Sequence, residues 1–415
     1  MTIKRLFLAL LLLVGLSAGA QTIRNDQYII GTVDTLRSQI LNETRNIGIY
    51  VPKGANDSSF ARKRYPVVYL LDGDSHFMSV AGMIQQLSQV NGNTVLPEMI
   101  IVAIPNTDRV RDLTPTNSLS YMGKNEPGFK TSGGGESFLQ FMQKELMPYI
   151  DAKYPTAPYK MLIGHSFGGL TVMNALINHT DMFNSYVAID PSMWWHDQKL
   201  LNESVAAFKD KRFAGRSLFI GIANTARMDT SRVRRDTSVK TLHERSILRL
   251  KEILQSNAGN QLQFASKYYP NDDHGSVPFI AEYDAFRFIF KNYPVPAALQ
   301  AQLTDPTTGT LPVKALAEHY RDLSRRIGYT INPPGDKINE IGHYLLKNET
   351  ADKAFSLFML NINNYPNSAR VYAAMGDYYA FKKNNANAML YYRKALTLKK
   401  DKEIEDKLEA LMPKK

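Results

Sequence analysis

The 415-residue sequence contains no cysteine, and this absence excludes several kinds of chemistry. Without thiols, the chain has no disulfide bond, no thiolate zinc or iron–sulfur site and no cysteine nucleophile. Tryptophan is rare as well, with two residues, and only one apolar run is long. The composition, with 44% hydrophobic and 21% charged residues, is that of a globular protein. Any catalysis must therefore use hydroxyl, imidazole or carboxylate groups.

The long apolar run lies near the N-terminus, follows Lys4 and Arg5, and extends from Leu6 to Leu16. The small residues Ser17–Ala20 come directly after it. A basic start, a short apolar core and an Ala-x-Ala ending are typical of a secretory signal peptide, and the run is shorter than the ~20 residues of a membrane-spanning helix. We therefore expect residues 1–20 to be cleaved and the mature protein to be periplasmic or secreted. It would have no membrane span and no cysteine that could carry a lipid.

Short apolar runs alternate with amphipathic stretches between about Thr35 and Tyr293. Seven runs predict strands: Ile47–Val51, Val67–Leu71, Ile100–Ile104, Lys160–Ile163, Ser185–Ile189, Leu218–Ile222 and Leu262–Tyr269. Strands separated by helices imply βαβ units and a largely parallel sheet that is buried on both faces. The first strand region, which no helix follows, is expected to form an antiparallel edge. Residues 21–294 therefore predict an α/β domain.

The pattern changes after Pro294. Residues 295–312 are rich in Pro, Thr, Gly and Gln, and we expect them to be a linker. Residues 313–415 are expected to be a small all-α domain with an internal repeat. Small residues recur in it at a spacing of 34, Gly342 with Gly376 and Ala354 with Ala388. This spacing resembles the tetratricopeptide repeat, whose arrays present a concave peptide-binding surface, so a protein partner is expected at this domain.

The residues from Gly164 to Gly168 form a G-x-S-x-G motif centred on Ser166. The motif comes directly after a predicted strand and directly before a helical pattern, Leu170–Asn178. A sharp strand-to-helix turn strains the backbone of the central residue and requires small neighbours. Such a turn presents the serine hydroxyl at the carboxyl edge of the sheet, near the positive end of the next helix. In this context the motif predicts a nucleophile elbow.

A serine hydroxyl needs a base near neutral pH. Four histidines follow Ser166 in the α/β domain: His179, His196, His243 and His274. His179 ends the elbow helix and His243 falls inside a helical pattern, whereas His274 lies in a loop just past the last strand. A nucleophile elbow goes with the chain order Ser–acid–His, which places the base in that loop. We therefore expect His274 to be the base.

Three segments resemble one esterase family of α/β-hydrolases: the elbow Gly-His-Ser-Phe-Gly-Gly, the strand end Tyr69–Gly73, and Asp273–Pro278. The family includes S-formylglutathione hydrolase (esterase D), enterobactin-type siderophore esterases, feruloyl and acetylxylan esterases, and mycolyl transferases. The resemblance covers about residues 28–293. It implies an α/β-hydrolase fold for the catalytic domain 21–294 and the cleavage of acyl esters, with siderophore esterases the most similar members.

The resemblance also implies particular roles for residues. Ser166 and His274 match the nucleophile and base positions of the family. The backbone N–H groups of Asp74 and Phe167 match its oxyanion hole. Two fixed donors beside the nucleophile stabilise a tetrahedral oxyanion by ~3 kcal/mol each.

An acid that orients the base is harder to place. It is expected after the predicted strand 218–222 and before the next helix, where Asp229, Asp236 and Glu244 lie. Family spacing points to the neighbourhood of Lys240, which is not acidic. Asp236 is the preferred candidate and Asp229 the alternative, although Asp236 could simply cap a helix. A Ser–His dyad without an acid is left open.

Other residues on the same sheet edge are candidates for substrate binding. Trp194 and Trp195 could form an aromatic wall for an acyl or aryl group, or pack in the core. Arg109 could meet an anionic substrate, or be a solvated loop charge. No metal-ligand spacing is found, because His243 and Glu244 lack the second histidine of a zinc motif, and no basic–aromatic interleaving indicates nucleic-acid binding. We therefore expect no metal, no cofactor and no nucleic-acid partner.

Together these observations predict an exported serine hydrolase that cleaves carboxylic esters through an acyl-enzyme. The expected substrate is a small-molecule or polysaccharide-linked ester, with a siderophore-type or polyphenol-type ester favoured. One alternative is a partner-binding protein that uses the helical repeats, with the α/β domain as a scaffold. Another is an acyltransferase, because an alcohol can intercept an acyl-enzyme in place of water.

Overall fold

The computed structural model describes residues 22–24, 27–55, 60–348 and 350–413. The predicted signal peptide lies outside these residues. The chain divides into two compact units, Met1–Lys53 with Tyr65–Lys291, and Gly54–Arg64 with Asn292–Lys415. In the described part of the chain, no helix has both the length and the apolar character needed to span a bilayer.

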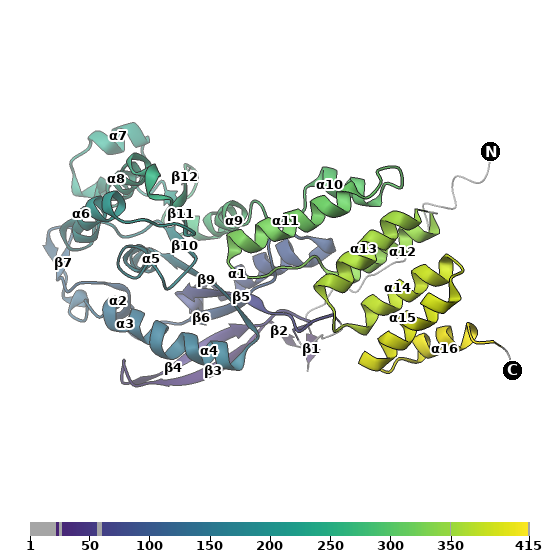
Figure 1. Cartoon of the computed structure of the whole chain (residues 1–415). Coiled ribbons are helices and arrows are strands. Elements are labelled where there is room, and N and C mark those ends of the chain that lie inside the picture. The colour runs from purple at the N-terminus through teal and green to yellow at the C-terminus, as the bar shows by residue number, and fades with distance from the viewer. Residues whose placement is uncertain (1–21, 25–26, 56–59, 349, 414–415) are drawn as a thin grey trace. The chain divides into compact units, whose positions relative to one another are not determined.

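The first unit is built on an eight-stranded sheet in the order β12-β11-β10-β9-β5-β6-β4-β3 (Figure 1). The six strands from β12 to β6 run parallel, whereas β4 and β3 pair antiparallel at one edge, as predicted. The strands are β3 (Thr32–Ser38), β4 (Glu43–Tyr50), β5 (Tyr65–Leu71), β6 (Ile100–Ile104), β9 (Thr156–His165), β10 (Ser185–Ile189), β11 (Ser217–Ala223) and β12 (Gln263–Tyr269). Each of the seven predicted strands overlaps one of them. Two short hairpins, β1–β2 (Thr22–Arg24, Gln27–Ile29) and β7–β8 (Ser120–Tyr121, Lys124–Asn125), lie outside this sheet.

The central strands are buried along their whole length because helices cover both faces of the sheet. Every residue of β5, β6, β10 and β11 is buried. The helices are α1 (Gly73–Ser88), α2 (Arg109–Leu113), α3 (Gly135–Phe141), α4 (Met147–Lys153), α5 (Phe167–Asn178), α6 (Trp195–Asp210), α7 (Thr230–Arg235), α8 (Leu242–Ser256) and α9 (Val277–Ile289). A π-helical turn at Met142–Leu146 joins α3 to α4. This is the α/β-hydrolase architecture that the sequence predicts.

The second unit is all-helical. Its helices are α10 (Ala297–Thr304), α11 (Leu311–Ile327), α12 (Gly335–Lys347), α13 (Ala351–Asn364), α14 (Ala369–Phe381), α15 (Asn385–Leu398) and α16 (Lys402–Ala410). The pair α12–α13 recurs as α14–α15, with every helix end displaced by 34 positions, such as residues 335 and 369. A Cβ added at Gly342 would lie 2.4 Å from the Phe358 ring, and one at Gly376 would lie 2.4 Å from the Tyr392 ring. These glycines therefore let an aromatic ring pack directly on the neighbouring helix.

Two segments differ from the predicted domain boundaries. The expected linker 295–312 contains the helix α10, and its Leu303 is buried in one core with Leu316 of α11. Residues 54–64, which we assigned to the α/β domain, group with the helical unit. The Phe60 ring there lies edge-on to Tyr365, with ring centroids 5.5 Å apart.

Candidate active site

Ser166 occupies a strained turn between β9 and α5. Its backbone has φ 59° and ψ −114°, a conformation that residues other than glycine rarely adopt. A Cβ at Gly164 would lie 2.4 Å from the backbone of Gly168, and one at Gly169 would lie 2.9 Å from Pro191. The glycines around the serine are therefore required by close backbone approach, as the motif predicts.

Hydrogen bonds to the end of β10 hold this turn in place. The Ser166 N–H donates to the Ile189 carbonyl at 3.0 Å, and the Ser192 N–H donates to the Ser166 carbonyl at 3.0 Å. The Ser166 hydroxyl lies 3.3 Å from the Ser192 hydroxyl. Ser166 as a whole is half-buried.

His274 lies in the loop that follows β12, at the same edge of the sheet. Its ring centroid is 4.5 Å from that of His165, the residue before Ser166. Its Nδ1 lies 2.6 Å from Oδ2 of Asp190, the residue that follows β10. A carboxylate can only accept, so Nδ1 carries the proton, and Nε2 is the ring nitrogen left to act as a base. The structure thus places Ser166, Asp190 and His274 after the carboxyl ends of β9, β10 and β12, at one edge of the sheet.

The Asp190 carboxylate is fully buried and has several hydrogen-bond donors. Its Oδ1 accepts from the Ala223 N–H at 3.0 Å. Its Oδ2 accepts from Thr225 Oγ1 at 3.2 Å and from His243 Nε2 at 2.8 Å, in addition to His274. Burial alone raises the pKa of this carboxyl, but the hydrogen bonds from His243 and His274 outweigh burial and hold the pKa of Asp190 well below its usual range. Asp190 is therefore a buried anion beside the imidazole.

The acid that faces His274 is therefore Asp190, and the predicted acids lie elsewhere. Asp229 caps the start of α7 and accepts from the Ser231 N–H at 2.8 Å. Asp236 follows the end of α7 and accepts from the Ser238 N–H at 2.6 Å. Both are bound by local backbone because short acidic side chains satisfy free N–H groups at helix ends. The order Ser–acid–His along the chain still holds, but the acid follows β10 instead of β11.

The two predicted oxyanion donors lie in the first turns of helices. Asp74 is the second residue of α1, and Phe167 is the first residue of α5. Backbone N–H groups in a first helical turn have no acceptor within their own helix. Because β5 and β9 are neighbours in the sheet, the two helix starts are adjacent. This placement agrees with a shared anion site near Ser166, and the role itself stays a prediction.

Arg109, the predicted contact for an anionic substrate, already has an anionic partner. Its Nε lies 2.7 Å from Asp72 Oδ1, and its guanidinium donates a second bond of 3.0 Å to Asp72 Oδ2. It also donates to the His165 carbonyl at 3.3 Å and lies over the Phe167 ring at 5.4 Å. Burial raises the pKa of the Asp72 carboxyl, but Arg109 and Asn106 hold that pKa below its usual value. Arg109 therefore ties the loops beside Ser166 together, and its charge is largely matched.

Five aromatic rings pack edge-to-face beside the nucleophile. Trp194 and Trp195 are 6% and 2% exposed, so they are core residues of this cluster. Phe129 contacts Trp195 and Phe167 at centroid distances of 5.0 and 5.9 Å, and Tyr121 contacts Trp194 at 5.2 Å. Tyr121 is 44% exposed. The solvent-facing part of the predicted aromatic wall is thus Tyr121 with the half-buried Phe129. The two buried tryptophans pack against these rings.

Four histidines lie in a group at the site, and the sequence predicts a role for His274 alone among them. His76, His165, His274 and His243 form a row in which neighbouring ring centroids lie 6.1, 4.5 and 5.2 Å apart. Burial, followed by the nearby His274, lowers the pKa of His165 to about 3, so this ring is neutral. His76 Nδ1 lies 3.8 Å from the buried carboxyl of Glu282 on α9, where burial raises the pKa to about 8. No spacing in the sequence indicated this row, because its members come from four separate elements.

Asp190, His243 and His274 also form a group that could hold a metal ion. One ligand atom from each lies within 4.8 Å of the other two. Two imidazoles and a carboxylate are usual ligands for zinc and other divalent ions. In the structure, however, both ring nitrogens bond directly to the same carboxylate oxygen. That bonding fully accounts for the group as an acid with two imidazole donors.

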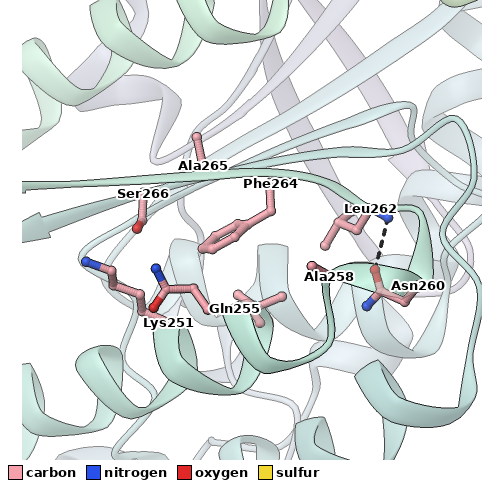
Figure 2. Close-up of a pocket in the computed structure, with 9 residues that line it drawn as sticks. Lys251, Gln255, Ala258, Asn260, Leu262, Phe264, Ala265 and Ser266 are labelled. Carbon is pink, nitrogen blue, oxygen red and sulfur yellow. Dashed lines mark hydrogen bonds between the residues drawn. The ribbon is translucent and has the colours of Figure 1, made fainter.

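A separate hollow of about 440 Å³ is lined by residues at the start of β12, whereas His274 follows the end of that strand. Figure 2 shows the residues that line it. It is bounded by the last turns of α8 and by the first residues of β12. Lys251, Gln255 and Phe264 point into it. Neither Ser166, Asp190, His274 nor any of the aromatic residues beside them lines this hollow, so it is not part of the Ser166 site.

Residues 38–275 match the family described as Putative esterase. The chain belongs to this esterase family. The matched region contains Ser166, Asp190 and His274, and so it includes the whole geometry just described.

The chain is similar to ferri-bacillibactin esterase BesA of Bacillus subtilis, with 31% identity over 173 residues, which are 39% of this chain and 59% of BesA. It is similar to the siderophore enterobactin esterase of Emericella nidulans, with 27% identity over 241 residues, 51% of this chain and 77% of that protein. The chain thus spans little more than half of BesA. The crystal structure of an IroE-like serine hydrolase from Shewanella oneidensis has 32% identity and a TM-score of 0.68, and the match covers 80% of this chain and 99% of that one.

Proposed function

We propose that this esterase-family protein is an exported serine hydrolase that cleaves carboxylic esters through an acyl-enzyme. One observation carries the proposal. The strained Ser166 turn, the His274 imidazole and the buried Asp190 anion lie together at the carboxyl edge of one parallel sheet. A serine, a histidine with a free nitrogen, and an acid that orients the histidine are the groups of a catalytic triad.

In the proposed acylation step, Ser166 Oγ bonds to the ester carbonyl carbon and its proton passes to His274 Nε2. The serine hydroxyl must first turn from Ser192 toward the imidazole, as catalytic contacts often close only with substrate bound. Asp190 stabilises the imidazolium through its bond to Nδ1. The carbon–oxygen bond of the ester then breaks, and the leaving alcohol takes the proton from Nε2.

Deacylation repeats these steps with water as the nucleophile. His274 takes a proton from water, the new bond forms at the acyl carbon, and Ser166 leaves with the proton. In both steps a negative charge develops on the carbonyl oxygen. The N–H groups of Phe167 and Asp74 are the proposed donors to that oxygen, and each such donor is worth ~3 kcal/mol of transition-state stabilisation. An alcohol in place of water would give transfer instead of hydrolysis.

The favoured substrate is an ester with an aromatic acyl group, of the siderophore or polyphenol type. Two relatives of the chain are named as siderophore esterases. The exposed Tyr121 and the half-buried Phe129 offer ring faces and edges beside the nucleophile, and aromatic pairs gain ~1 kcal/mol beyond the area that they bury. These two observations support an aryl group bound next to Ser166.

A panel of esters tests the proposal. Wild type and Ser166→Ala would be compared on acetyl, feruloyl, acetylated-xylan and catechol-lactone esters. We expect turnover of at least one ester, with a feruloyl or catechol ester preferred, and its loss in Ser166→Ala. Equal rates in both proteins would remove Ser166 from the mechanism. Product analysis with an added alcohol separates hydrolysis from acyl transfer.

Export is tested separately. The proposal rests on the basic, apolar and small-residue pattern of residues 1–20. We expect the protein recovered from the periplasm or medium to begin at Gln21, as read by mass spectrometry. Recovery of the intact N-terminus from the cytoplasm alone would contradict it.

A further inference from the structure

The Asp190 carboxylate is shared between two histidines, and only one of them can serve the nucleophile. His274 is partly exposed and its loop faces Ser166, whereas His243 is 7% exposed on the first turn of α8. Both reach the same oxygen, Oδ2, at 2.6 and 2.8 Å. The two rings are nearly perpendicular, with an interplanar angle of 87° and centroids 5.2 Å apart. The Asp–His pair of the proposed mechanism therefore has a second imidazole built into it.

The contacts of His243 fix what this imidazole can do. Because the carboxylate accepts, Nε2 of His243 must carry a proton, and the ring acts as a donor to Asp190. Asp190 is fully buried and has only the neighbouring N–H, hydroxyl and imidazole groups to replace water. A buried anion needs such donors both to stay charged and to keep one orientation. His243 supplies the donor that approaches Oδ2 from the side of α8.

We propose that His243 is a positioning residue: its Nε2–H holds Oδ2 of Asp190 in the direction that meets His274 Nδ1. The proposal rests on the ester hydrolysis proposed above and adds a fourth member to the Ser166, His274 and Asp190 group. His243 touches neither the substrate nor the serine. It acts through Asp190, because its hydrogen bond to Oδ2 helps to fix the orientation of that carboxylate.

The surroundings of the two imidazoles define the expected pH dependence. Titratable groups near them include Glu244 on α8, His165 at the end of β9, and Asp273, which directly precedes His274 in the chain. None of these is a donor to Oδ2 of Asp190 among the bonds found in the described residues. Without the His243 donor, Asp190 would hold a proton on His274 more strongly, because one bond that stabilises the free anion is gone. The acid limb of the kcat/KM profile would then move to higher pH.

Two substitutions separate positioning from packing. Gln places an amide N–H as many bonds from Cβ as His243 Nε2, whereas Leu has similar bulk and no donor. We expect His243→Leu to lower kcat by about 10²-fold, with an acid limb at higher pH, since a misplaced catalytic group has an effect of this order. We expect His243→Gln to stay within about fivefold of wild type, with the acid limb in place. His179→Gln, at a surface histidine bound to Glu136, is the matched control and should change nothing.

A measurement on wild type keeps the proposal testable if His243→Leu fails to fold. In ¹⁵N-histidine NMR at pH 7, His243 should be protonated at Nε2, and unprotonated Nε2 would overturn the proposal. It would also be overturned if folded His243→Leu kept the wild-type rate and pH profile, or if His243→Gln and His243→Leu were equally impaired. Bound zinc that activity requires, removed by a chelator, would overturn it as well. Ser166→Ala distinguishes the two levels: full activity there refutes ester hydrolysis by Ser166, whereas an inactive Ser166→Ala with an unaffected His243→Leu refutes only the role of His243.

Discussion

Each unit of the molecule pairs an aspartate with a histidine, and the two pairs differ in whether a ring nitrogen of the histidine is left free. In the first unit, Asp190 bonds to Nδ1 of His274. In the helical unit, Asp377 bonds to Nε2 of His343 at 2.9 Å. Both histidine side chains are 39% exposed, so access to solvent does not separate them.

The second ring nitrogen makes the difference. Nδ1 of His343 lies 2.8 Å from the Asn339 carbonyl, so both of its nitrogens face acceptors, an arrangement that favours the doubly protonated ring. Accordingly, the hydrogen bond to Asp377 raises the pKa of His343. His274 has an acceptor only at Nδ1 among the described residues, and Ser166 lies at the same sheet edge. An Asp–His pair is thus equipped for catalysis only when one nitrogen is left for a proton from a nucleophile.

Replacing each aspartate by asparagine should give the largest difference in kcat between the two pairs. Asp190→Asn should lower kcat by roughly 10⁴-fold, because the amide no longer favours the imidazole tautomer with a free Nε2. Asp377→Asn should leave kcat unchanged, because its histidine serves no nucleophile. The measurement is turnover of a p-nitrophenyl ester by both variants. Comparable losses in the two would mean that the Asp190 pair is not specific to catalysis.

Asp377→Asn should instead weaken the helical unit. Asp377 accepts from Tyr392 at 2.7 Å and pairs with Lys407 at 3.2 Å as well as with His343, so it joins α12, α14, α15 and α16. Loss of the charge should lower the free energy of unfolding by about 1–2 kcal/mol. Urea unfolding with hydrogen exchange read over residues 335–410 checks this. Asp236→Asn, at a helix end in the other unit, is the control with little expected effect on this region.

A glycine substitution in the helical unit should lower stability without changing catalysis. Gly376→Ala would place a methyl group 2.4 Å from the Tyr392 ring, and such overpacking lowers the free energy of unfolding by about 1–3 kcal/mol. Ester turnover should stay at the wild-type level. Gly82→Ala in α1 is the matched control, because nothing lies within 4 Å of the added Cβ and alanine favours a helix by about 0.5–1 kcal/mol. A Gly376→Ala protein as stable as Gly82→Ala would disprove the close packing of the repeat.

The smallest expected effect is the pH dependence of the helical unit. The raised pKa of His343 gives stability that is fully present below pH 6.5, its unfolded value, and is lost as the pH rises through the folded pKa. For Asp377, burial raises the pKa but the His343 bond and other partners lower it more. That contribution is present above pH 3.8 and is lost as the pH falls through the folded pKa. We expect a maximum between these values, of about 1 kcal/mol or less after screening by solvent.

Urea midpoints from pH 3 to pH 9 measure this profile in the full chain, with the signal read over residues 335–410. His343→Asn should flatten the alkaline side of the profile and leave the acid side. A profile that keeps its alkaline slope in His343→Asn would show that another group causes it.

The sequence predicted the sheet well because its signal is local. A run such as Ile100–Ile104 is apolar at every position, and β6 is buried at every position. The elbow was likewise predictable, since Gly164, Ser166 and Gly168 are neighbours in the chain. The 34-residue spacing in the helical unit is also visible in the sequence, because Gly342 and Gly376 recur at that spacing. In the structure, both glycines meet equivalent aromatic rings.

The acid and the domain boundary depend on contacts that no local pattern contains. Asp190 directly follows the buried strand β10 at the carboxyl edge of the sheet, and this is the signal for it in the sequence. The chain order Ser–acid–His is also satisfied by the segment after β11, which contains Asp229 and Asp236. Residues 54–64 carry no periodicity, and contacts such as that of Phe60 with Tyr365 assign them to the helical unit. In both cases, the deciding partner is more than 80 residues away in the chain.

Covalent labelling by a fluorophosphonate, read by intact mass and peptide mapping, tests the central claim most directly. The reagent reacts with a serine hydroxyl only where a base activates it. We predict one adduct, on Ser166, that is absent in Ser166→Ala, strongly slowed in His274→Ala and Asp190→Asn, and unchanged in Asp377→Asn. An adduct on another residue, or labelling of Ser166 at the same rate in His274→Ala, would contradict the account.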